Sequence, residues 1–566
     1  MSNSPDQQAD GLPGLSGLPD IPGFPEESLL QELANQFFKS PPIPSPTQSG
    51  AGAVPSSVAG SGISPSAINQ GNGVNIDDPQ TSLPDPHFAG QGHVPSSVAG
   101  SGISPSAASY KRPRHNDREA ASDKSIQPAT FTTDPAFYFL TDPRPFVHSR
   151  TTQPAQNALS SPPFDVNQIR RDFPILHQYV NGHPLVWLDN AATTQKPKAV
   201  IDSISNYYRH DNSNIHRAAH ELAARSTDAY EGARGKVARF LNAASPNEII
   251  FVRGSTEAIN LVAHSWGRQF PEPGDEIIVS HLEHHANIVP WQQLAAKKNL
   301  KLKVIPVDDD GQVLLDEFSR LLGNRTKLVS FTQVSNALGT ITPAKKIVEM
   351  AHAAGAKVLV DGAQAVSHMP VDVRDLNADW YVFSGHKVFG PTGIGVLYGR
   401  EDLLNATEPW QGGGNMIKDV TFEHTSYQQA PARFEAGTGN IADAVGLGTA
   451  LDYVMTIGMQ NIFRYEHYLL QYATRLLKEI PGLHLIGTAP DKAGVLSFVL
   501  DGYRTEEVGA ALNSRGIAVR SGHHCAQPIL RRFGQESTVR PSLALYNTCA
   551  DIDALIVTLQ RLASAR

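Results

Sequence analysis

The fold is decided by a stretch that begins with EIIFVRG (residues 248–254) and STEAINLVAHSW (residues 255–266), a short β-branched run followed by a helical pattern. Further apolar runs follow, with helical patterns between them: DEIIVS (275–280), KLKVIPV (301–307), KLVSFTQV (327–334) and AKVLVDGA (356–363). This alternation predicts an α/β fold with a mostly parallel sheet and crossover helices. In such sheets ligands bind beyond the carboxyl ends of the strands, so the residues after each run are candidates for a site.

The composition of the whole chain excludes several classes of protein. The 566 residues are 40% hydrophobic, and the net charge is −8 with scattered basic residues, which argues against a nucleic-acid partner. The start, MSNSPDQQADG, lacks a signal-peptide pattern, and no run approaches the roughly 18 apolar residues of a membrane span. The cysteines, Cys525 and Cys549, form neither a disulfide framework nor a CxxC metal pattern. We therefore expect a cytoplasmic protein without a membrane or metal partner.

Residues 1–160 differ from the rest because they are rich in Pro, Gly, Ser, Ala and Gln, a composition that predicts disorder. The segment VPSSVAGSGISPSA occurs twice there, at residues 54–67 and 94–107. It is either a duplicated neutral linker or, as we prefer, a repeated docking peptide that gains avidity from two copies. PEESLLQELANQFFKSPP (25–42) predicts a short amphipathic helix whose apolar stripe needs a partner, either the catalytic domain or another protein. A third segment, DPAFYFLTDPRPF (134–146), is either a similar docking element or a strap on the protein's own surface.

Lys387 and Asp361 each follow an apolar run. Lys387 lies in YVFSGHKVFGPTGIG (381–395), where a lysine at the end of a strand is placed to form a Schiff base. Asp361 closes AKVLVD, so its carboxylate is expected at the ligand crevice, where it can pair with a protonated pyridine nitrogen. Either residue alone has a simpler interpretation, a solvated lysine and a helix cap, but together they indicate a pyridoxal phosphate (PLP) site.

A phosphate and a ring also have candidate partners. Ser255 and Thr256 open the helix after EIIFVRG, and helix N-terminal N–H groups stabilise phosphate, although Ser255 can be only an N-cap. His284 and His285 follow DEIIVS, where an imidazole can lie flat over an aromatic cofactor ring.

The decisive segment is IAVRSGHHCAQPIL (517–530), in which Cys525 lies on a loop with glycine and histidine neighbours. Access and nearby imidazoles favour a nucleophilic thiol there, whereas we expect Cys549 to be a buried, inert cysteine. Arg540, in VRPSLALYN, can offer a planar guanidinium to a substrate carboxylate, and the following proline favours an extended backbone that aims it.

From about residue 164 onward the chain resembles the SufS/CsdA class of cysteine desulfurases, which are fold-type I PLP enzymes. The resemblance covers about 400 residues and is carried by these motifs: FDVNQIRRDFPIL, LDNAATTQKP, RGSTEAIN, EHHANIVPWQ, VSNALGT, VDGAQAV, FSGHKVFGPTGIG, RFEAGTGN and RSGHHCA. It implies a mostly parallel seven-stranded sheet in a PLP-binding large domain (161–425), which includes an N-terminal segment that packs on the small domain. A smaller C-terminal α+β domain (426–566) carries the Cys525 loop.

The resemblance also implies a role for each site residue. Lys387 holds PLP as a Schiff base and Cys525 carries the persulfide, while the ring is held by His284, Asp361 and, at its phenolic oxygen, Gln364. The phosphate is held by Thr256, Ser384 and His386, with Thr438 reaching it from the other subunit of a homodimer. The substrate carboxylate is held by Asn336 and Arg540, and the approach to the site is lined by His216, Arg217 and Arg520.

These roles imply that L-cysteine becomes L-alanine, that Lys387 is the base for the α-proton, and that a thiol or protein acceptor takes the sulfur from Cys525. Two alternatives remain: another PLP lyase, such as a selenocysteine lyase or a kynureninase-like hydrolase, and an inactive PLP-fold scaffold. Only the desulfurase requires Cys525 for sulfur transfer.

Two features depart from ordinary members of the class. The chain reads GTGN where relatives often read GTPN, so Gly439 is expected to loosen the loop that carries Thr438. Residues 1–160 are an addition, and they resemble the cargo-loading segment of desulfurases packaged in encapsulin shells. That resemblance implies a shell protein as partner and an encapsulin nanocompartment as location.

Overall fold

The computed structural model describes residues 164–216 and 220–565. The predicted extension, with its repeated segments and its short helix, lies outside the described residues, and so does Arg217. No helix in the described part of the chain combines the length and the apolar character that crossing a membrane requires.

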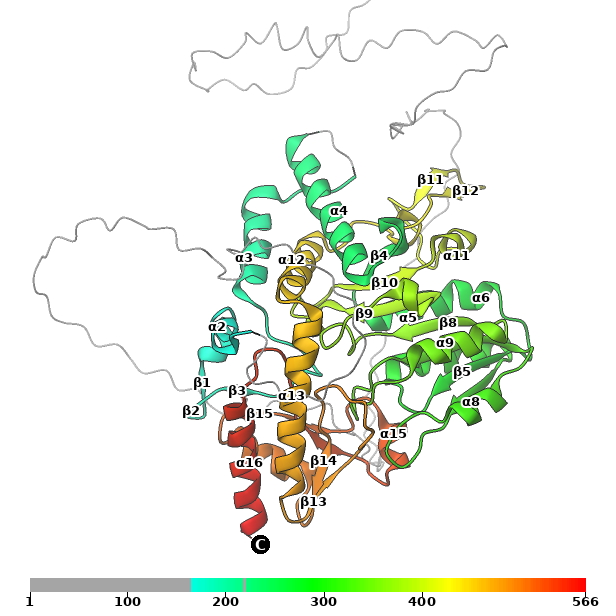
Figure 1. Ribbon diagram of the computed structural model, residues 1–566. Coiled ribbons are helices and arrows are strands. Elements are labelled where there is room, and N and C mark those ends of the chain that lie inside the picture. Colours follow the sequence, from blue (N-terminus) through cyan, green and yellow to red (C-terminus); the bar gives the residue numbers. More distant parts are fainter. Residues whose placement is uncertain (1–163, 217–219, 566) are drawn as a thin grey trace, which may run out of the picture. The chain divides into compact units, whose positions relative to one another are not determined.

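A seven-stranded sheet forms the centre of the larger part of the structure (Figure 1). All neighbouring strands are parallel except β10, which runs antiparallel to β4 and β9 on either side of it. The predicted α/β architecture with a mostly parallel sheet is therefore confirmed. The order across the sheet is β4 (Ile249–Val252), β10 (Gly395–Gly399), β9 (Trp380–Ser384), β8 (Lys357–Asp361), β7 (Thr326–Thr332), β5 (Glu276–Ser280) and β6 (Lys301–Ile305).

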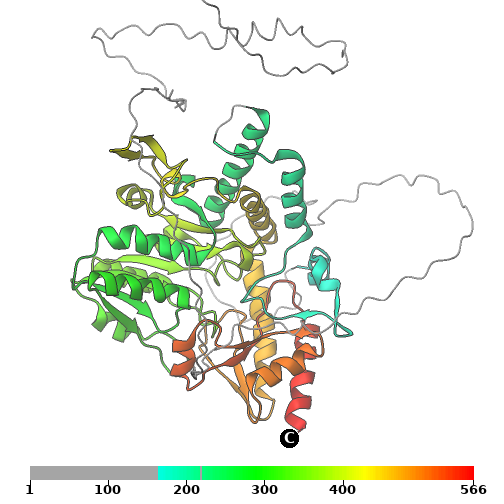
Figure 2. The same cartoon turned by 180° about the vertical axis from the view of Figure 1, so that it is seen from behind.

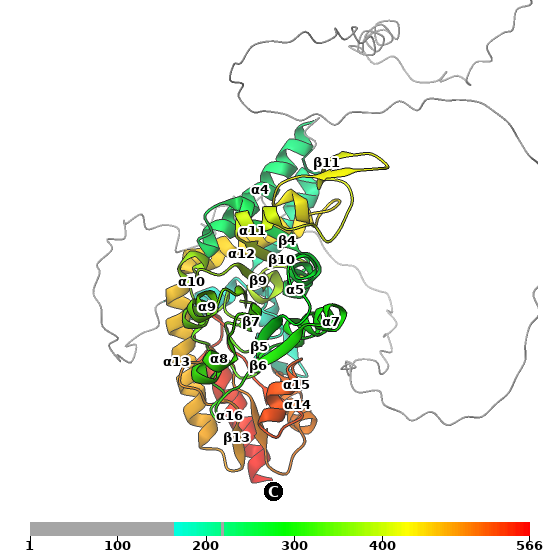
Figure 3. The same cartoon turned by 90° about the vertical axis from the view of Figure 1, so that its right-hand side faces the viewer.

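Helices cover both faces of this sheet, as the side view in Figure 3 shows. Alternate side chains of one strand enter different cores: Ile277 and Val279 pack in one, and Ile278 packs in the other. Strands buried on both faces read as continuous apolar runs, which explains why EIIVS and KVLVD lack polar alternation. One face is covered by α5 (Ser255–His264), α6 (Trp266–Gln269), α7 (Val289–Lys298) and α11 (Glu401–Ala406). The other core includes residues of α4 (Glu221–Leu241), α8 (Leu315–Leu321), α9 (Ala344–Ala353), α10 (Val373–Leu376) and α12 (Ile441–Ile457), and α3 (Lys198–Asn206) packs against it.

A second, antiparallel sheet carries the C-terminal part of the chain. Its strand order is β13 (Leu483–Leu485), β14 (Phe498–Leu500), β17 (Thr538–Arg540) and β16 (Arg520–Gly522). A separate core packs this sheet against α13 (Met459–Lys478), α14 (Thr505–Asn513) and α16 (Cys549–Ser564), and α15 (Gln527–Arg532) follows the Cys525 loop.

The beginning of the described chain joins this C-terminal part. Strand β3 (Val186–Trp187) pairs in parallel with β15 (Ile517–Ala518), so the cyan and red segments meet in Figure 2. Helix α12 instead packs against α3 and α4. The division of the chain at residue 425 stays a prediction.

Shorter elements complete the fold: α2 (Val166–Arg171), the pair β1 (Tyr179–Val180) and β2 (His183–Pro184), and the hairpin of β11 (Ile417–Val420) and β12 (Thr425–Tyr427). The helical turns are η2 (Pro174–His177), η3 (Tyr207–Asp211), η4 (Pro246–Glu248), η5 (His285–Asn287), η6 (Gly385–Lys387) and η7 (Ala432–Phe434).

Two glycines allow the large sheet to close tightly at the ends of its strands. A Cβ on Gly395 of β10 would lie 2.5 Å from Gly254 Cα, at the point where β4 passes into α5. A Cβ on Gly362 would lie 2.0 Å from the Tyr381 hydroxyl. Close backbone approach at these positions lets the segments after β4, β8 and β9 gather at one edge.

Candidate active site

The carboxyl ends of five strands gather most of the predicted site residues around one cavity of about 200 Å³. The predicted residues that line it are Ser255, Thr256, His284, Asn336, Asp361, Gln364, Ser384, His386, Lys387, Arg520, Cys525 and Arg540. Thr438 and His216 are absent from its lining. The cavity therefore has candidates for every predicted role except the contact across subunits.

Lys387 lies at the end of η6, directly after β9, and its side chain is half-buried in the cavity lining. Burial lowers the pKa of its ammonium to about 8, and the nearby Asp361 carboxylate opposes that shift. None of the hydrogen bonds among the described residues involves Lys387 Nζ. A lysine with a lowered pKa and an uncommitted amine is suited to attack an aldehyde.

Asp361 ends β8, and His284 follows β5, which lies on the other side of β7. Asp361 Oδ1 accepts a hydrogen bond from Ala363 N at 2.9 Å, and burial raises the pKa of the carboxyl while Lys387 lowers it. Burial and positive neighbours, Lys387 first among them, lower the pKa of His284 to about 3, so its ring is neutral. Its Nδ1 accepts from Ala286 N at 3.0 Å, which fixes the ring orientation. Gln364 Nε2 donates to Ala191 O at 2.7 Å.

The predicted phosphate partners lie at the N-terminus of α5. Ser255 N donates to Ser384 Oγ at 2.9 Å, so the helix start is joined to the end of β9. The Thr256 side chain is exposed and makes no hydrogen bond among the described residues. Burial, with Lys387 and Lys196 nearby, lowers the pKa of His386 to about 4. Hydroxyls, a neutral imidazole and free helix N–H groups form a donor set that suits a phosphate.

Hydrogen bonds hold the backbone of the Cys525 loop, although the loop contains Gly522. His524 and Cys525 both have left-handed backbones, with φ of 53° and 56°. His285 N donates to Cys525 O at 2.8 Å, Cys525 N donates to His523 Nδ1 at 3.0 Å, and His524 is buried against Thr538. Non-glycine residues in this conformation persist only where the surroundings hold them. The half-buried thiol is thus fixed at the cavity rather than on a loose loop.

Cys549 does not lie where we predicted it. It is half-buried at the first position of α16, at the edge of the C-terminal core, and its Sγ lies 3.7 Å from the Tyr468 hydroxyl. The prediction of a fully buried cysteine is wrong because the N-cap Thr548 places this residue at a helix end rather than in its middle. Cys549 does not line the cavity.

The end of the cavity opposite the α5 N-terminus carries the guanidinium groups. Arg540 is buried, and its Nη1 donates to Asn336 O at 2.9 Å. Two buried polar atoms here, Arg540 Nε and Asn336 Oδ1, have no hydrogen-bond partner among the described residues. Buried polar groups are normally paired, so these atoms indicate the place of a polar ligand group.

Sequence reasoning missed the residues that support this lining. Asp189, in LDNAATTQKP, accepts from Arg540 and Arg520, and its only signal in the sequence is a carboxylate after a short apolar run. Glu283 is fully buried beside His284 and accepts from Thr332 N at 2.9 Å, and burial raises its pKa to about 8. A charged residue inside an apolar segment is the signal that points to Glu283.

Thr438 and His216 lie together in a second cluster, away from the cavity lining. Thr438 Oγ1 donates to Asn214 Oδ1 at 3.3 Å, and His216 Nε2 lies 2.9 Å from Glu231 Oε1. Glu231 also pairs with the buried Arg234 at 2.8 Å. These two predicted site residues therefore lie in the same region of the chain's structure, outside the lining of the cavity that the other predicted residues form.

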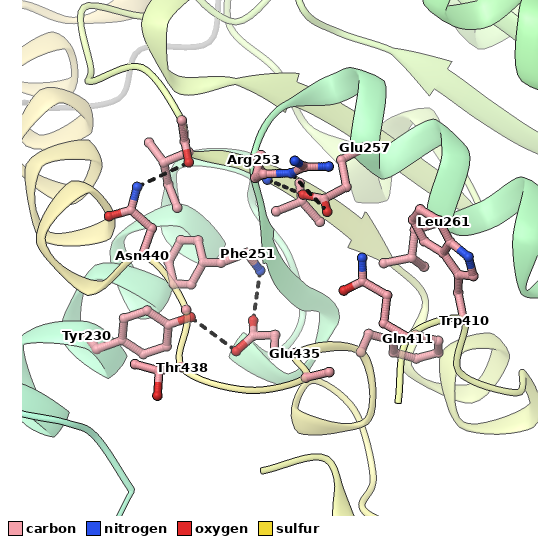
Figure 4. A pocket seen from close by; sticks show the side chains of 16 residues that line it. Tyr230, Phe251, Arg253, Glu257, Leu261, Trp410, Gln411, Glu435, Thr438 and Asn440 are labelled. Atoms are coloured by element: carbon pink, nitrogen blue, oxygen red, sulfur yellow. Dashed lines mark hydrogen bonds and ion pairs between the residues drawn. The ribbon is translucent and has the colours of Figure 1, made fainter. Parts of the chain in front are cut away.

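Arg234 connects this cluster to a larger hollow of about 570 Å³, which Figure 4 shows. Its guanidinium lies over the rings of Tyr230 and Phe251, with 5.0 and 4.8 Å to the centroids, and pairs with Glu435 at 2.7 Å. Glu435 also accepts from Phe251 N and from the Tyr230 hydroxyl. A Cβ on residue 439 would approach that hydroxyl to 3.2 Å, so this glycine lies close to the ring.

The fold and the cavity define a fold-type I PLP enzyme. The residues fit PLP because they offer a half-buried, uncommitted lysine, a buried carboxylate, a neutral imidazole and a phosphate donor set at a helix N-terminus. Residues 186–555 match the model of the aminotransferase class-V family, and the chain belongs to this family, within the SufS/CsdA-type cysteine desulfurases.

Relatives in this group share much of the chain. A cysteine desulfurase of Synechococcus elongatus is 70% identical over 399 residues, which are 70% of this chain and 64% of that protein. The chain thus spans less than two thirds of that relative's length. A cysteine desulfurase of Pectobacterium atrosepticum is 50% identical over 400 residues, 70% of this chain and 98% of that protein. The crystal structure of the cysteine desulfurase CsdA from Escherichia coli, in an S-sulfonic acid form, superposes with a TM-score of 0.66 at 39% identity, covering 71% of this chain and 99% of CsdA.

The lowered pKa of Lys387 predicts how PLP loading depends on pH. Only the neutral amine attacks an aldehyde, and below a pKa of about 8 its fraction rises about tenfold per pH unit. The loading rate of the apoprotein, followed by visible absorbance, should rise with pH up to about 8 and then level off. Borohydride reduction and mass spectrometry should place the adduct on Lys387, with none in Lys387→Ala. A rate that keeps rising to pH 10 would contradict the desolvated lysine.

Proposed function

We propose that this protein is a cysteine desulfurase that converts L-cysteine to L-alanine and holds the sulfur as a persulfide on Cys525. The observation that supports it most directly is the joint lining of one cavity by Lys387, Cys525 and Arg540. These side chains supply an amine, a thiol and a carboxylate partner within one small volume. The names of the similar proteins are consistent with this activity.

Each residue around the cofactor position has a chemical task. PLP, when bound, supplies a ring that accepts electrons from the substrate. Lys387 Nζ takes the proton from the substrate α-carbon, and a pKa of about 8 leaves part of the amine neutral near pH 7. Asp361 would pair with the ring nitrogen, and the neutral His284 would contact the ring without adding charge. Thr256, Ser384 and His386 would hold the phosphate.

Sulfur transfer takes place between the substrate thiol and Cys525. The Cys525 thiolate attacks the substrate sulfur, so a sulfur–sulfur bond forms and the bond between the substrate sulfur and its β-carbon breaks. The electron pair of that bond stays on the carbon skeleton, which takes up protons and leaves as alanine. A thiol, free or on an acceptor protein, then attacks the persulfide, takes the outer sulfur and returns Cys525 to the thiolate.

A homodimer accounts for the second cluster. Thr438 and His216 are absent from the cavity of their own chain; Thr438 lines the hollow of Figure 4 and contacts Asn214, two positions before His216. In our proposal this cluster completes the cavity of the partner subunit, with Thr438 on its phosphate and His216 and Arg217 on its approach. Arg217 lies outside the described residues.

Residues 1–160 have a separate role in this proposal. The repeated VPSSVAGSGISPSA segments bind an encapsulin-type shell protein, so that the enzyme works in the cytoplasm inside a nanocompartment. The support is the unchanged repeat of a 14-letter segment in a chain region of low complexity. The catalytic chemistry does not use it.

Substituting each cysteine separately tests the nucleophile. Cys525→Ser should lower alanine formation by about a thousandfold or more and abolish the persulfide, because a hydroxyl cannot carry the sulfur. Its visible PLP absorbance should remain. Cys549→Ser, the matched control, should change activity little because the residue lies at the start of α16. If Cys549→Ser instead stopped sulfur release, the nucleophile would be wrongly chosen.

Mixing inactive subunits tests the dimer. Thr438→Asp should repel the phosphate of the partner's cofactor, and Cys525→Ser should inactivate its own cavity. When the two variants are mixed and exchange subunits, one cavity of each mixed dimer regains the natural Cys525 and Thr438, so activity should return to a substantial fraction of the wild-type value. A mixture that stays inactive after proven exchange would show that Thr438 acts within its own chain.

Deleting residues 1–160 tests the targeting role. Catalytic activity should change little, while co-purification with a co-expressed shell protein should be lost. Removing one repeat should weaken loading, and removing both should nearly eliminate it, because linked weak motifs reinforce one another. A truncated enzyme that loads as well as the full chain would refute docking, and a lowered melting temperature with a newly exposed apolar patch would favour a strap on the enzyme's own surface.

A further inference from the structure

Two arginines that line the cavity lie opposite each other on neighbouring strands. Arg520 of β16 and Arg540 of β17 are register partners in an antiparallel pair, so their side chains leave the same face of the sheet. Like charges directly opposite one another destabilise a strand pair. A neutralising group is therefore required near these two guanidiniums.

Asp189 is that group. Its Oδ1 accepts from Arg540 Nη2 at 3.3 Å, and its Oδ2 accepts from Arg520 Nε and Nη2, each at 3.3 Å. The Asp189 side chain is 13% exposed, against 2% for Arg540 and 48% for Arg520. Both arginines line the cavity and Asp189 does not, so a ligand meets the arginines and not this carboxylate.

The net charge of Arg520, Arg540 and Asp189 together matches one ligand carboxylate. Arg520 and Arg540 carry two positive charges, and Asp189 cancels one of them. Arg540 keeps a buried Nε–H without a partner, which is a donor for one carboxylate. Asp361 and Lys387, which also line the cavity, carry opposite charges that interact, so no further positive charge is left uncompensated among the lining residues.

We propose that Asp189 is a positioning and specificity residue. Because its carboxylate pairs with both Arg520 and Arg540, it limits the cavity to amino acids with a single carboxylate. Without it, Arg520 is free to pair with a second acidic group on the ligand side chain. This inference rests on the proposed function, because the ligand is taken to be an amino acid bound through its α-carboxylate.

Amino acid binding to the PLP-loaded, full-length protein tests the proposal. The dissociation constants of L-alanine, with one carboxylate, and L-aspartate, with two, are measured by calorimetry and by the change in visible absorbance. In the wild type L-alanine should bind more tightly. In Asp189→Asn the ratio of the L-aspartate to the L-alanine constant should fall by about tenfold, since one added charge-assisted hydrogen bond is of that order.

Two variants separate specificity from general damage. Asp202→Asn removes an exposed carboxylate of α3 that pairs with Lys198 and does not line the cavity, and it should leave the ratio unchanged. The double variant Asp189→Asn with Arg520→Gln restores the charge balance, so the ratio should return to within about twofold of the wild-type value. Damage to the fold would weaken both ligands alike and would not be repaired by a second substitution.

An unchanged ratio in Asp189→Asn, or a double variant that does not recover, would overturn the assignment of Asp189. Should Asp189→Asn not fold, Asp189→Glu keeps the charge and must keep the wild-type preference, and loss of that preference would equally overturn it. Failure of the proposed function gives a different result, in which the loaded wild-type protein binds neither amino acid.

Discussion

The site depends on the parallel pairing of β5, β7, β8 and β9, since parallel strands bring all their carboxyl ends to the same edge. His284, Asn336 and Lys387 follow three of these strands, and Asp361 is the last residue of the fourth. They are far apart in sequence and adjacent in space only because of this pairing. The continuous apolar runs that make the strands therefore also fix the positions of the side chains that line the cavity.

Burial at that edge sets the chemistry. A lysine in water is almost entirely protonated near neutral pH, whereas desolvation lowers the pKa of Lys387 to about 8 and that of His284 to about 3. Burial acts in the opposite direction on Asp361, and Lys387 partly offsets it. The same low-polarity surroundings make the buried guanidinium of Arg540 costly unless a carboxylate compensates it, and Asp189 occupies that position.

The Cys525 loop shows how a flexible-looking sequence becomes rigid. Gly522 and two histidines suggest mobility, yet hydrogen bonds from His285 and to His523 hold the cysteine backbone in a left-handed conformation. The thiol therefore has a defined direction toward the substrate sulfur in the proposed reaction. Thr438 and His216 differ from Cys525 in their location. Hydrogen bonds and an ion pair with neighbouring residues hold their side chains, but neither residue lines the cavity of its own chain.

The sequence by itself determined the α/β class and the identity of most cavity residues, because apolar periodicity and the residue after each run are local properties that a linear pattern records. The residues Lys387, Asp361 and Ser255 were accessible in this way. Asp189 was not, since its role arises from contacts with Arg520 and Arg540 that are separated from it by more than 300 positions. The half-buried Cys549 was also missed, because burial depends on what packs against a helix end. Only the tertiary structure decided these points, since charge compensation and burial are properties of groups brought together by folding and not of their order along the chain.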